Sequence, residues 1–325
     1  MTLLQLYDVA ELQDEVRALA KQRDAVILAH NYQLPEIQDV ADYVGDSLGL
    51  ARRAAASDAS VIAFCGVHFM AETASVLSPH KTVLIPDLDA GCSLADAITP
   101  EQLAAWQARH PDAITVMYVN TTAQITAMTD YCVTSANAVS VVEHILREHG
   151  SDTEILFGPD MFLGAYVERR IGRALHVWDV ECHVHAGIRP KDIEHVRAEH
   201  PEADFLIHPE CGCSTSVMEY VAAGDVESAG VHMLSTGGML RYARDAKPGS
   251  TAIVATEVGM LHPLREAAPD TEFIAANERA ACIYMKMITL PKLRDALRDL
   301  VHEVKVPTDV AERARLPIER MIAIS

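Results

Sequence analysis

The stretch CSLADAITPEQLAAWQARHPDAITVMYVN, residues 92–120, recurs without a gap as CHVHAGIRPKDIEHVRAEHPEADFLIHPE at residues 182–210. The two stretches are identical at seven of 29 positions, three of them Cys or Pro, which indicates an internal repeat. In each, a cysteine precedes a helix pattern that starts with Pro, a residue tolerated at the first helical position because its missing N–H would be unpaired there. A short apolar run and a polar triplet follow. The repeat therefore predicts a unit of cysteine, helix, buried strand and polar cluster.

Two further copies of this unit extend the repeat over most of the chain. Residues 12–32 (LQDEVRALAKQRDAVILAHNY) have the helix and the strand but lack the leading cysteine. Cys282 is followed nine residues later by Pro291 and a helix pattern over 290–304. The order of the copies favours three units, with the last cysteine and helix completing the first unit.

The strands of these units are expected to end at one common point. The apolar runs at 25–29, 114–119 and 204–208 are short and rich in β-branched residues. Strands joined through helices are parallel with right-handed crossovers, and ligands bind beyond the carboxyl ends of such strands. The polar residues at these ends are His30-Asn31-Tyr32, Tyr118-Val119-Asn120 and His208-Pro209-Glu210. We expect an α/β fold of three αβα sandwich domains with short parallel sheets, related by a pseudo-threefold axis, with the active site at their common interface.

The repeat also sets the domain boundaries that we expect. Domain 1 covers residues 1–88, and the C-terminal segment 288–325 packs back on it. Domain 2 covers 89–178 and domain 3 covers 179–287. Within them we predict helices at 36–44, 48–56 and 215–223, and a strand at 251–260. A hydroxyl residue begins the second helix of each unit: Ser47, Ser135 and Thr236.

Composition narrows the class of function. The net charge is −19, and no basic stripe is present, so nucleic acid and anionic membranes are disfavoured as partners. No apolar run approaches the roughly 18 residues of a membrane span, and the first residues lack the basic start and apolar run of a secretory signal. We therefore expect a cytoplasmic protein. Seven cysteines, an odd number, favour metal or catalytic use over disulfides.

Three of the cysteines occupy equivalent positions in the repeat. Cys92, Cys182 and Cys282 are 90 and 100 residues apart, which matches no compact metal motif. Their shared position at a turn outside the sheet nevertheless suits three thiolates that face one centre. Such a set fits either zinc with an open coordination position or a 4Fe-4S cluster with one free iron. Cys65 and Cys132 lie in strand patterns and are assigned to the core.

Cys211-Gly212-Cys213, close to His208, is a competing metal site. A single C-x-C pair is a weak motif, because free cysteine is also a common core residue. We favour partly buried thiols for this pair.

Several ionisable residues at strand and turn ends are candidates for acid and base chemistry. Glu210 follows a buried strand and is the best candidate for a general base. Tyr32 and Tyr118 offer phenol protons at strand ends, or simply hydrogen-bond as half-buried tyrosines. His30 and His185 also lie just past strand or turn ends, where a structural histidine is about equally expected.

Ten motifs in order, AHNYQ, GDS, AGCS, YVNTTA, TSANA, GPDMFLG, HPEC, STGGM, TEVGMLH and CIYMKMITL, cover nearly the whole chain. With the three cysteines in place, the sequence resembles the quinolinate synthase family, the iron-sulfur enzymes of the bacterial and archaeal de novo NAD pathway. The resemblance implies a 4Fe-4S cluster on Cys92, Cys182 and Cys282, with its fourth iron facing the substrate as a Lewis acid. It implies the condensation of iminoaspartate (iminosuccinate) with dihydroxyacetone phosphate to give quinolinate, phosphate and two waters. The enzyme that supplies iminoaspartate is then a candidate partner protein.

The resemblance also implies roles for individual residues. Substrate would contact His30, Ser47, Tyr118, Asn120, Ser135, His208, Glu210 and Thr236. Acid and base chemistry would involve Tyr32, Tyr118, His185 and Glu210. Some members of the family carry a C-x-x-C-x-x-C run that ends at the third cluster ligand, whereas this chain has Ala276 and Arg279 at the two earlier positions. A local disulfide of that kind is therefore excluded.

Two other classes of function remain open from the sequence. One is a non-catalytic iron-sulfur redox or oxygen sensor. The other is a zinc-dependent aldolase or hydrolase that uses His208, Cys211 and Cys213.

Overall fold

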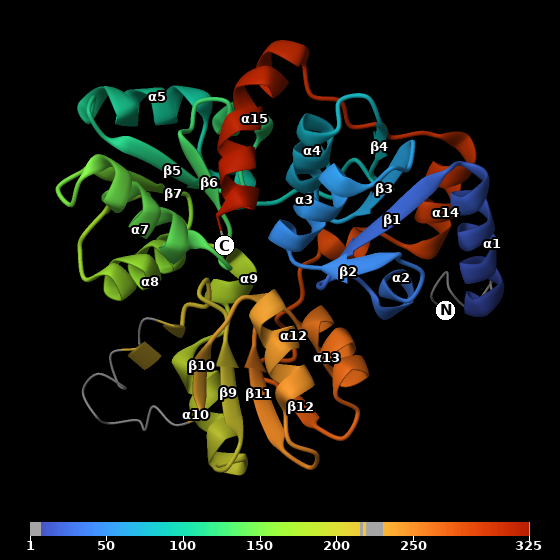
Figure 1. Ribbon diagram of the computed structural model, residues 1–325. Coiled ribbons are helices and arrows are strands. Elements are labelled where there is room, and N and C mark those ends of the chain that lie inside the picture. Colours follow the sequence, from blue (N-terminus) through green and yellow to red (C-terminus); the bar gives the residue numbers. More distant parts are fainter. Residues whose placement is uncertain (1–7, 215–216, 219–229, 325) are drawn as a thin grey trace.

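Three four-stranded parallel sheets form the framework of the computed structural model, which describes residues 8–214, 217–218 and 230–324. The strand orders are β2-β1-β3-β4, β6-β5-β7-β8 and β10-β9-β11-β12, so the first strand of each unit is always second in its sheet. Every strand pair is parallel. Helices flank each sheet, and the three units surround a common centre (Figure 1). The predicted fold class is confirmed.

The strands are short, and the central ones are buried. In the first unit they are β1 (Ala25–His30), β2 (Tyr43–Gly45), β3 (Val61–Cys65) and β4 (Thr82–Leu84). In the second they are β5 (Ile114–Tyr118), β6 (Tyr131–Val133), β7 (Ile155–Gly158) and β8 (His176–Val177). In the third they are β9 (Asp204–Ile207), β10 (Val231–Met233), β11 (Thr251–Ala255) and β12 (Glu272–Ala275).

Helices connect the strands within each unit. The α-helices are α1 (Val9–Gln22), α2 (Pro35–Gln38), α3 (Ser47–Ala56), α4 (His68–Leu77), α5 (Pro100–Arg109), α6 (Ala123–Thr126), α7 (Ala138–His149), α8 (Met161–Ile171), α9 (His183–Ala186), α10 (Pro190–Glu199), α12 (Thr236–Asp245), α13 (Leu261–Ala267), α14 (Leu290–Asp299) and α15 (Thr308–Ala323). Short 3-10 helices are η2 (Ala95–Ala97), η3 (Val258–Met260) and η4 (Met285–Met287).

The internal repeat is visible residue by residue in the helices. Helices α5 and α10 have the same bounds at an offset of 90, and α5 and α14 have the same bounds at an offset of 190. Pro occupies the first or second position of all three, and the Thr99 side chain caps the start of α5 by accepting a hydrogen bond from Gln102 N. The Pro at the helix start therefore recurs in each copy, whereas the capping Thr side chain is found in α5 and not in α10 or α14.

The C-terminal segment belongs to more than one unit. Helix α14 packs against α1 and β3 of the first unit, as expected for the segment 288–325. Helix α15 packs against α3 and α4 of the first unit and also against β6 and α6 of the second, so it bridges the two (Figure 1). The boundaries 1–88, 89–178 and 179–287 stay predictions.

Some predicted elements are wrong in extent. The helix predicted at 36–44 ends at Gln38, and Tyr43–Gly45 forms the edge strand β2 instead, because β-favouring Tyr43 and Val44 pair with β1. The strand predicted at 251–260 ends at Ala255, where Glu257 caps η3. The helix predicted at 290–304 ends at Asp299, before Leu300 in the left-handed region. Most of the helix predicted at 215–223 lies outside the described residues.

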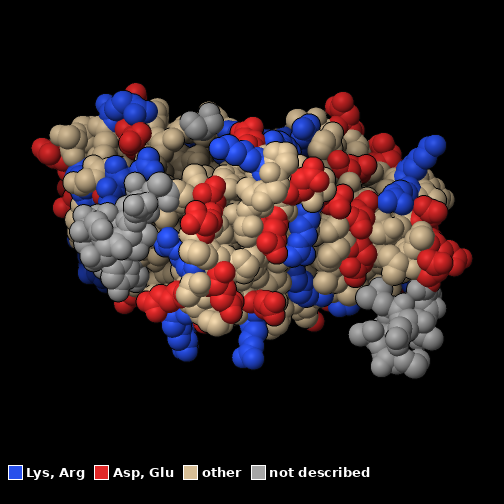
Figure 2. All heavy atoms as spheres, turned by 90° about the horizontal axis from the view of Figure 1, so that it is seen from below, with Lys and Arg blue, Asp and Glu red and all other residues tan. Residues whose placement is uncertain are grey.

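The described surface is mixed in charge. On the face shown in Figure 2, Lys and Arg side chains are interspersed with Asp and Glu. Among the residues that the structure describes, no helix is both long and apolar enough to cross a membrane.

Candidate active site

One pocket lies where the three units meet, beyond the carboxyl ends of their strands. The residues that the family resemblance implies for catalysis, substrate binding and the cluster all line it: His30, Tyr32, Ser47, Cys92, Tyr118, Asn120, Ser135, Cys182, His185, His208, Glu210, Thr236 and Cys282. Cys211 and Cys213 of the competing metal site do not line it. The structure thus brings together side chains that are up to 252 residues apart (282 − 30). Their roles stay predictions, but their juxtaposition is a feature of the fold.

Equivalent strands deliver the first polar side chains of the pocket. His30 is the last residue of β1, Tyr118 is the last residue of β5, and His208 directly follows β9. Because these three strands have the same place in their sheets, the three side chains reach the centre from three directions. Tyr32 and Glu210 follow two residues after His30 and His208.

The three repeat cysteines approach the pocket from the loops that precede η2, α9 and η4. Each is half-buried and not in a disulfide. Burial, together with the neighbouring Cys182 and Cys282, raises the pKa of the Cys92 thiol. Burial also raises the pKa of Cys282, and Cys182 adds to the effect. The mutual influence of the thiols is the result expected of three sulfurs around one centre.

A buried ion pair lies next to Cys182. His185 Nδ1 is 3.1 Å from Glu210 Oε2, and both side chains are about 3% exposed. Burial alone would raise the pKa of Glu210, but the charge and hydrogen bond of His185 outweigh it and bring this pKa to about 2. Burial alone would lower the pKa of His185, but its neighbours Tyr32, Cys182 and Glu210 raise it well above its usual value. The pair is therefore ionised near neutral pH.

The other ring nitrogen of His185 belongs to a hydroxyl cluster. His185 Nε2 lies 3.0 Å from Thr256 Oγ1 and 3.3 Å from the Tyr32 hydroxyl, and these two hydroxyls are 2.6 Å apart. Burial raises the pKa of Tyr32, so the phenol keeps its proton. Tyr32 is thus a proton donor that contacts a protonated imidazole.

Two further histidines in the pocket are neutral. Burial, aided by the nearby His208, lowers the pKa of His30 to about 3. Burial also lowers the pKa of His208 to about 3. His208 Nε2 lies 3.1 Å from the Ser135 hydroxyl, and its ring stacks on His185 at 4.9 Å between centroids. Neutral imidazoles next to a charged one give the pocket both hydrogen-bond donors and acceptors.

Two buried oxygen atoms in the pocket have no hydrogen-bond partner among the residues that the structure describes. They are Glu210 Oε1 and Asn120 Oδ1. Burial, with the charge of Glu210, also raises the pKa of Tyr118, which keeps its proton. Since buried polar atoms are generally paired, the two oxygens indicate a site that a polar ligand completes.

The predicted hydroxyls are only partly equivalent. Ser47 is the first residue of α3 and Thr236 is the first residue of α12, so both lie at helix N-termini. Ser135, however, lies three residues before α7, which starts at Ala138. The Asn137 side chain folds back on Thr134 N at 2.8 Å and delays the helix. The expectation that all three residues begin a helix is wrong for Ser135.

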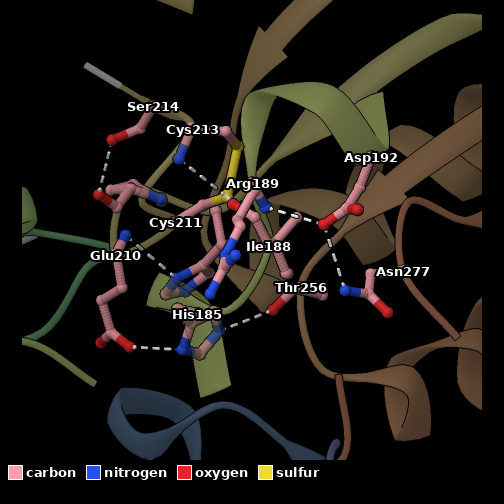
Figure 3. Close-up of a disulfide and its surroundings, with 12 residues drawn as sticks. His185, Ile188, Arg189, Asp192, Glu210, Cys211, Cys213, Ser214, Thr256 and Asn277 are labelled. Carbon is pink, nitrogen blue, oxygen red and sulfur yellow. Dashed lines mark hydrogen bonds and ion pairs between the residues drawn. A yellow bond between two sulfur atoms is a disulfide. The ribbon is translucent and has the colours of Figure 1, made fainter. Parts of the chain in front are cut away.

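The sequence expectation for the Cys211-Gly212-Cys213 pair is also wrong. The two cysteines form a disulfide, and both are fully buried. Figure 3 shows this disulfide between Cys211 and Cys213, in the segment that also carries Glu210, with His185 and Ile188 nearby. Thiolates are therefore not available from this pair, which removes the zinc site built on His208, Cys211 and Cys213.

Sequence reasoning missed several polar residues of the site. Glu257 lines the pocket and is 1% exposed, and Asp160 lies just behind it at 0%. Burial and the charge of Glu210 raise the pKa of Asp160 to about 8. Both residues follow the third strand of their units, in the GPD and TEV motifs. The search for polar residues at strand ends covered only the first strand of each unit, and the same search at the third strands would have found them. Ser93 and His183, also in the pocket, directly follow the repeat cysteines Cys92 and Cys182.

The donor atoms of the site fit metal chemistry in two ways. The three thiols suit an iron-sulfur cluster with one iron that has no protein ligand. In addition, Cys182, His185 and Glu210 each offer one donor atom, and these atoms lie within 4.8 Å of one another, a set that could hold a single ion.

The fold and the pocket define an α/β enzyme with a central, thiol-containing site assembled from three repeated units. The model of the family described as quinolinate synthetase A protein matches residues 14–323. Two relatives named quinolinate synthase are similar throughout. A protein from Thermus thermophilus is 54% identical over 313 residues, covering 96% of this chain and 97% of its own length. A protein from Mycobacterium tuberculosis is 55% identical over 311 residues, covering 95% of this chain and 88% of its own.

The chain belongs to the quinolinate synthase family. It is accordingly an enzyme of NAD biosynthesis that acts on small molecules.

Proposed function

We propose that this enzyme condenses iminoaspartate with dihydroxyacetone phosphate to form quinolinate, phosphate and two waters. The observation that carries the proposal is that all the residues implied for this reaction line one pocket at the junction of the three units. The partnerless oxygens of Glu210 and Asn120 support a polar ligand there. Relatives named quinolinate synthase, alike over nearly their whole length, support the same reaction.

We further propose a 4Fe-4S cluster as cofactor, held by Cys92, Cys182 and Cys282. The three half-buried thiols face one pocket, and no fourth free cysteine lines it among the described residues. When bound, the cluster would supply a Lewis-acidic iron for substrate oxygens. The shared influence of the thiols on their pKa values supports a common cofactor rather than three separate roles.

The protein groups around that centre suit the proton transfers of a condensation with dehydration. Glu210 Oε2 is engaged by His185, whereas Oε1 is free to accept a proton or a hydrogen bond from substrate. Tyr118 and Tyr32 retain their protons and serve as donors. His185, held in its charged form by Glu210, balances negative charge on substrate.

Anionic groups of the substrates need partners in a pocket with few cations. Ser47 and Thr236 lie at the N-termini of α3 and α12, where backbone N–H groups and the helix dipole favour anions. Neutral His30 and His208 can donate hydrogen bonds to carboxylate oxygens. We propose these two helix starts as the places for the phosphate and carboxylate groups.

Metal analysis and substitution under nitrogen test both parts of the proposal. Anaerobically purified protein should be brown and carry about four irons per chain, the number in one such cluster. Cys182→Ala should lose the iron. Tyr118→Phe should keep the iron and the colour but lose quinolinate formation from the two substrates. Colourless protein that binds zinc after anaerobic reconstitution would refute the cofactor, and full turnover by Tyr118→Phe would refute the residue's role.

The second candidate is a non-catalytic iron-sulfur sensor. Such a sensor would contain as much iron as the proposed enzyme, but it would not need a pocket in which polar atoms await a ligand. A dicarboxylate such as quinolinate should therefore perturb the cluster spectrum of the enzyme, whereas a sensor with an inaccessible iron would give no change.

A further inference from the structure

Two buried carboxylates occupy equivalent places behind the pocket. Asp160 lies two residues after β7, and Glu257 lies two residues after β11. Both side chains are at most 1% exposed. Burying a carboxylate is unfavourable unless its oxygens are hydrogen-bonded, so the contacts of these two indicate what they are for.

In each case one carboxyl oxygen accepts a hydrogen bond from the start of the helix that follows, and the other accepts one from the backbone of a cysteine loop. Asp160 Oδ1 accepts a hydrogen bond from Leu163 N at 2.7 Å, and Oδ2 accepts one from Cys182 N at 3.3 Å. Glu257 Oε2 accepts one from Gly259 N at 2.7 Å, and Oε1 accepts one from Cys282 N at 2.9 Å.

Each carboxylate thus connects the end of a buried strand to the backbone of a pocket cysteine. We propose that Asp160 and Glu257 are positioning residues that fix the Cys182 and Cys282 loops so that their thiols face a common cofactor. The inference rests on the proposed cluster.

Glu257 is further tied to the opposite side of the pocket. Lys286 Nζ lies 3.0 Å from Glu257 Oε1 and also donates to the carbonyl of Tyr32. The junction is tightly packed, because a Cβ at Gly259 would lie 2.7 Å from both Glu257 Oε2 and Lys286 Nζ. Contacts of Glu257 and Lys286 therefore link the Cys282 loop, η4 and the segment that follows β1.

The first unit has no carboxyl group at the position two residues after its third strand. Its equivalent residue, two positions after β3, is Val67, which has no side-chain acceptor. Among the described residues, no hydrogen bond from the Cys92 N–H is found. The Ser93 hydroxyl instead lies 2.7 Å from His183 Nδ1, so the Cys92 loop is attached to the Cys182 loop. Asp160 therefore supports two cysteine loops, one directly and one through His183, whereas Glu257 supports one.

Residues that orient metal ligands commonly change metal retention by 10- to 100-fold when they are replaced. We therefore compare Asp160→Asn and Glu257→Gln with wild type after anaerobic cluster reconstitution. The readout is the rate at which a chelator removes iron, followed by the visible absorption of the cluster. Both variants should lose iron about tenfold faster or more, and Asp160→Asn should be the faster of the two. The spectrum of the reduced cluster should also change, which a general loss of stability would not cause.

Asp130→Asn is the matched control. Asp130 Oδ2 accepts a hydrogen bond from Thr115 N at 2.8 Å, at the amino end of β5 and remote from the cysteines. Its variant should release iron within about twofold of the wild-type rate, well below the tenfold effect expected for the two positioning residues. Equal rates for Asp160→Asn, Glu257→Gln and Asp130→Asn would overturn the inference. A wild type that binds no iron would instead overturn the proposed cofactor.

Hydrogen exchange of the wild type without cofactor keeps the inference testable if a variant fails to fold. Peptides that contain the amides of Cys182 and Cys282 should show slower exchange at these positions than the peptide with Cys92. Equal exchange at the three cysteines would contradict the roles of Asp160 and Glu257.

Discussion

Glu210 and His185 illustrate how burial decides the chemistry of a side chain in this protein. Each alone would be driven toward its neutral form, but at 3.1 Å the two stabilise each other as ions. His30 and His208, with no carboxylate so close, lose their protons instead. One fully ionised pair and two neutral imidazoles therefore coexist in one pocket.

Glu210→Gln should abolish turnover without loss of the cluster. The amide is neutral at all pH values, so it cannot act as a base and cannot hold His185 in its charged form. We expect quinolinate formation to fall by about a hundredfold to ten-thousandfold, the usual contribution of acid and base catalysis. Iron content should be unchanged, because Glu210 is not one of the three thiol ligands. Glu199→Gln, an exposed residue of α10, is the control and should behave as wild type.

The neutral histidines predict a loss of stability in mild acid for the protein without cofactor. The pKa of His30 and of His208 is about 3 in the fold but about 6.5 in the unfolded chain, so only the unfolded chain gains protons below pH 6.5. The free energy of unfolding is therefore unaffected by these two histidines above pH 6.5, and it decreases as pH falls from 6.5 toward 3. His185 acts in the opposite sense, because its pKa is raised: it is already charged in the fold, whereas the unfolded chain gains that proton only as pH falls through about 6.5, so its contribution to stability grows over this range. Glu210, whose pKa is lowered, contributes only below about pH 4.5.

Between pH 7.5 and pH 5.5 each of the two histidines should therefore lower the free energy of unfolding by about 1.4 kcal/mol. Denaturant titrations at the two pH values measure the change. His185 should offset about 1.4 kcal/mol of the sum, and His208→Asn should remove the share of about 1.4 kcal/mol that belongs to His208. A variant that keeps the full pH dependence would show that His208 is not the group responsible.

At the residue scale, position in the repeat predicted the site better than residue type did. His30, Tyr118 and His208 were found because they end equivalent strands, and the cysteines because they start equivalent copies. Asp160 and Glu257 were missed because one precedes an α-helix and the other a 3-10 helix, so the sequences around them do not align. The Cys211–Cys213 disulfide was missed because the odd number of cysteines argued against disulfides in general.

At the scale of elements, the starts of the helices that begin with a Pro or a capping residue were predicted well, but two of the Pro-started helices, α2 and α14, end earlier than predicted. The errors fall where a segment is too short for local pattern to decide. Residues 36–44 carry apolar residues at helical spacing, yet hydrogen bonding of Tyr43–Gly45 to β1 prevails over it. Asp42 reinforces the turn, since its Oδ2 accepts a hydrogen bond from Ile27 N at 2.7 Å. Such a tertiary contact cannot be read from a nine-residue window.

Gly164→Ala should destabilise the second unit although alanine is the better helix former. A Cβ at Gly164 in α8 would lie 2.6 Å from Val177 Cγ1 and 3.3 Å from Phe157 Cδ1, so the helix would have to move off the sheet. Overpacking should lower the free energy of unfolding by about 1–3 kcal/mol net. This net value already includes the gain of about 1 kcal/mol from the better helix propensity of alanine. Thermal unfolding measures it. Adding Val177→Ala should relieve part of the loss, and a purely additive double variant would contradict the proposed clash.

At the scale of the whole molecule, three copies of one unit create a pocket that no single copy contains. The sequence predicted this arrangement because the copies are in the same order and each presents its polar strand end. The bridging role of α15 could not be predicted, because the helix has no counterpart in the other units. Only its contacts with α4 and β6 reveal that the C-terminal segment joins units one and two.

Asn137 tests whether this bridge holds the central site together. Its Nδ2 donates to the carbonyls of Met321 at 2.8 Å and Ile324 at 2.9 Å, and its Oδ1 accepts from Thr134 N. Asn137→Asp keeps the acceptor but loses both donors, and should lower the free energy of unfolding by about 2–4 kcal/mol because buried groups lose their partners. Since α15 joins two of the three units around the site of the proposed cluster, cluster loss to a chelator should also accelerate. Faster proteolysis near residue 307 should accompany it, and a destabilised variant with wild-type cluster retention would show that the centre does not depend on the C-terminal helix.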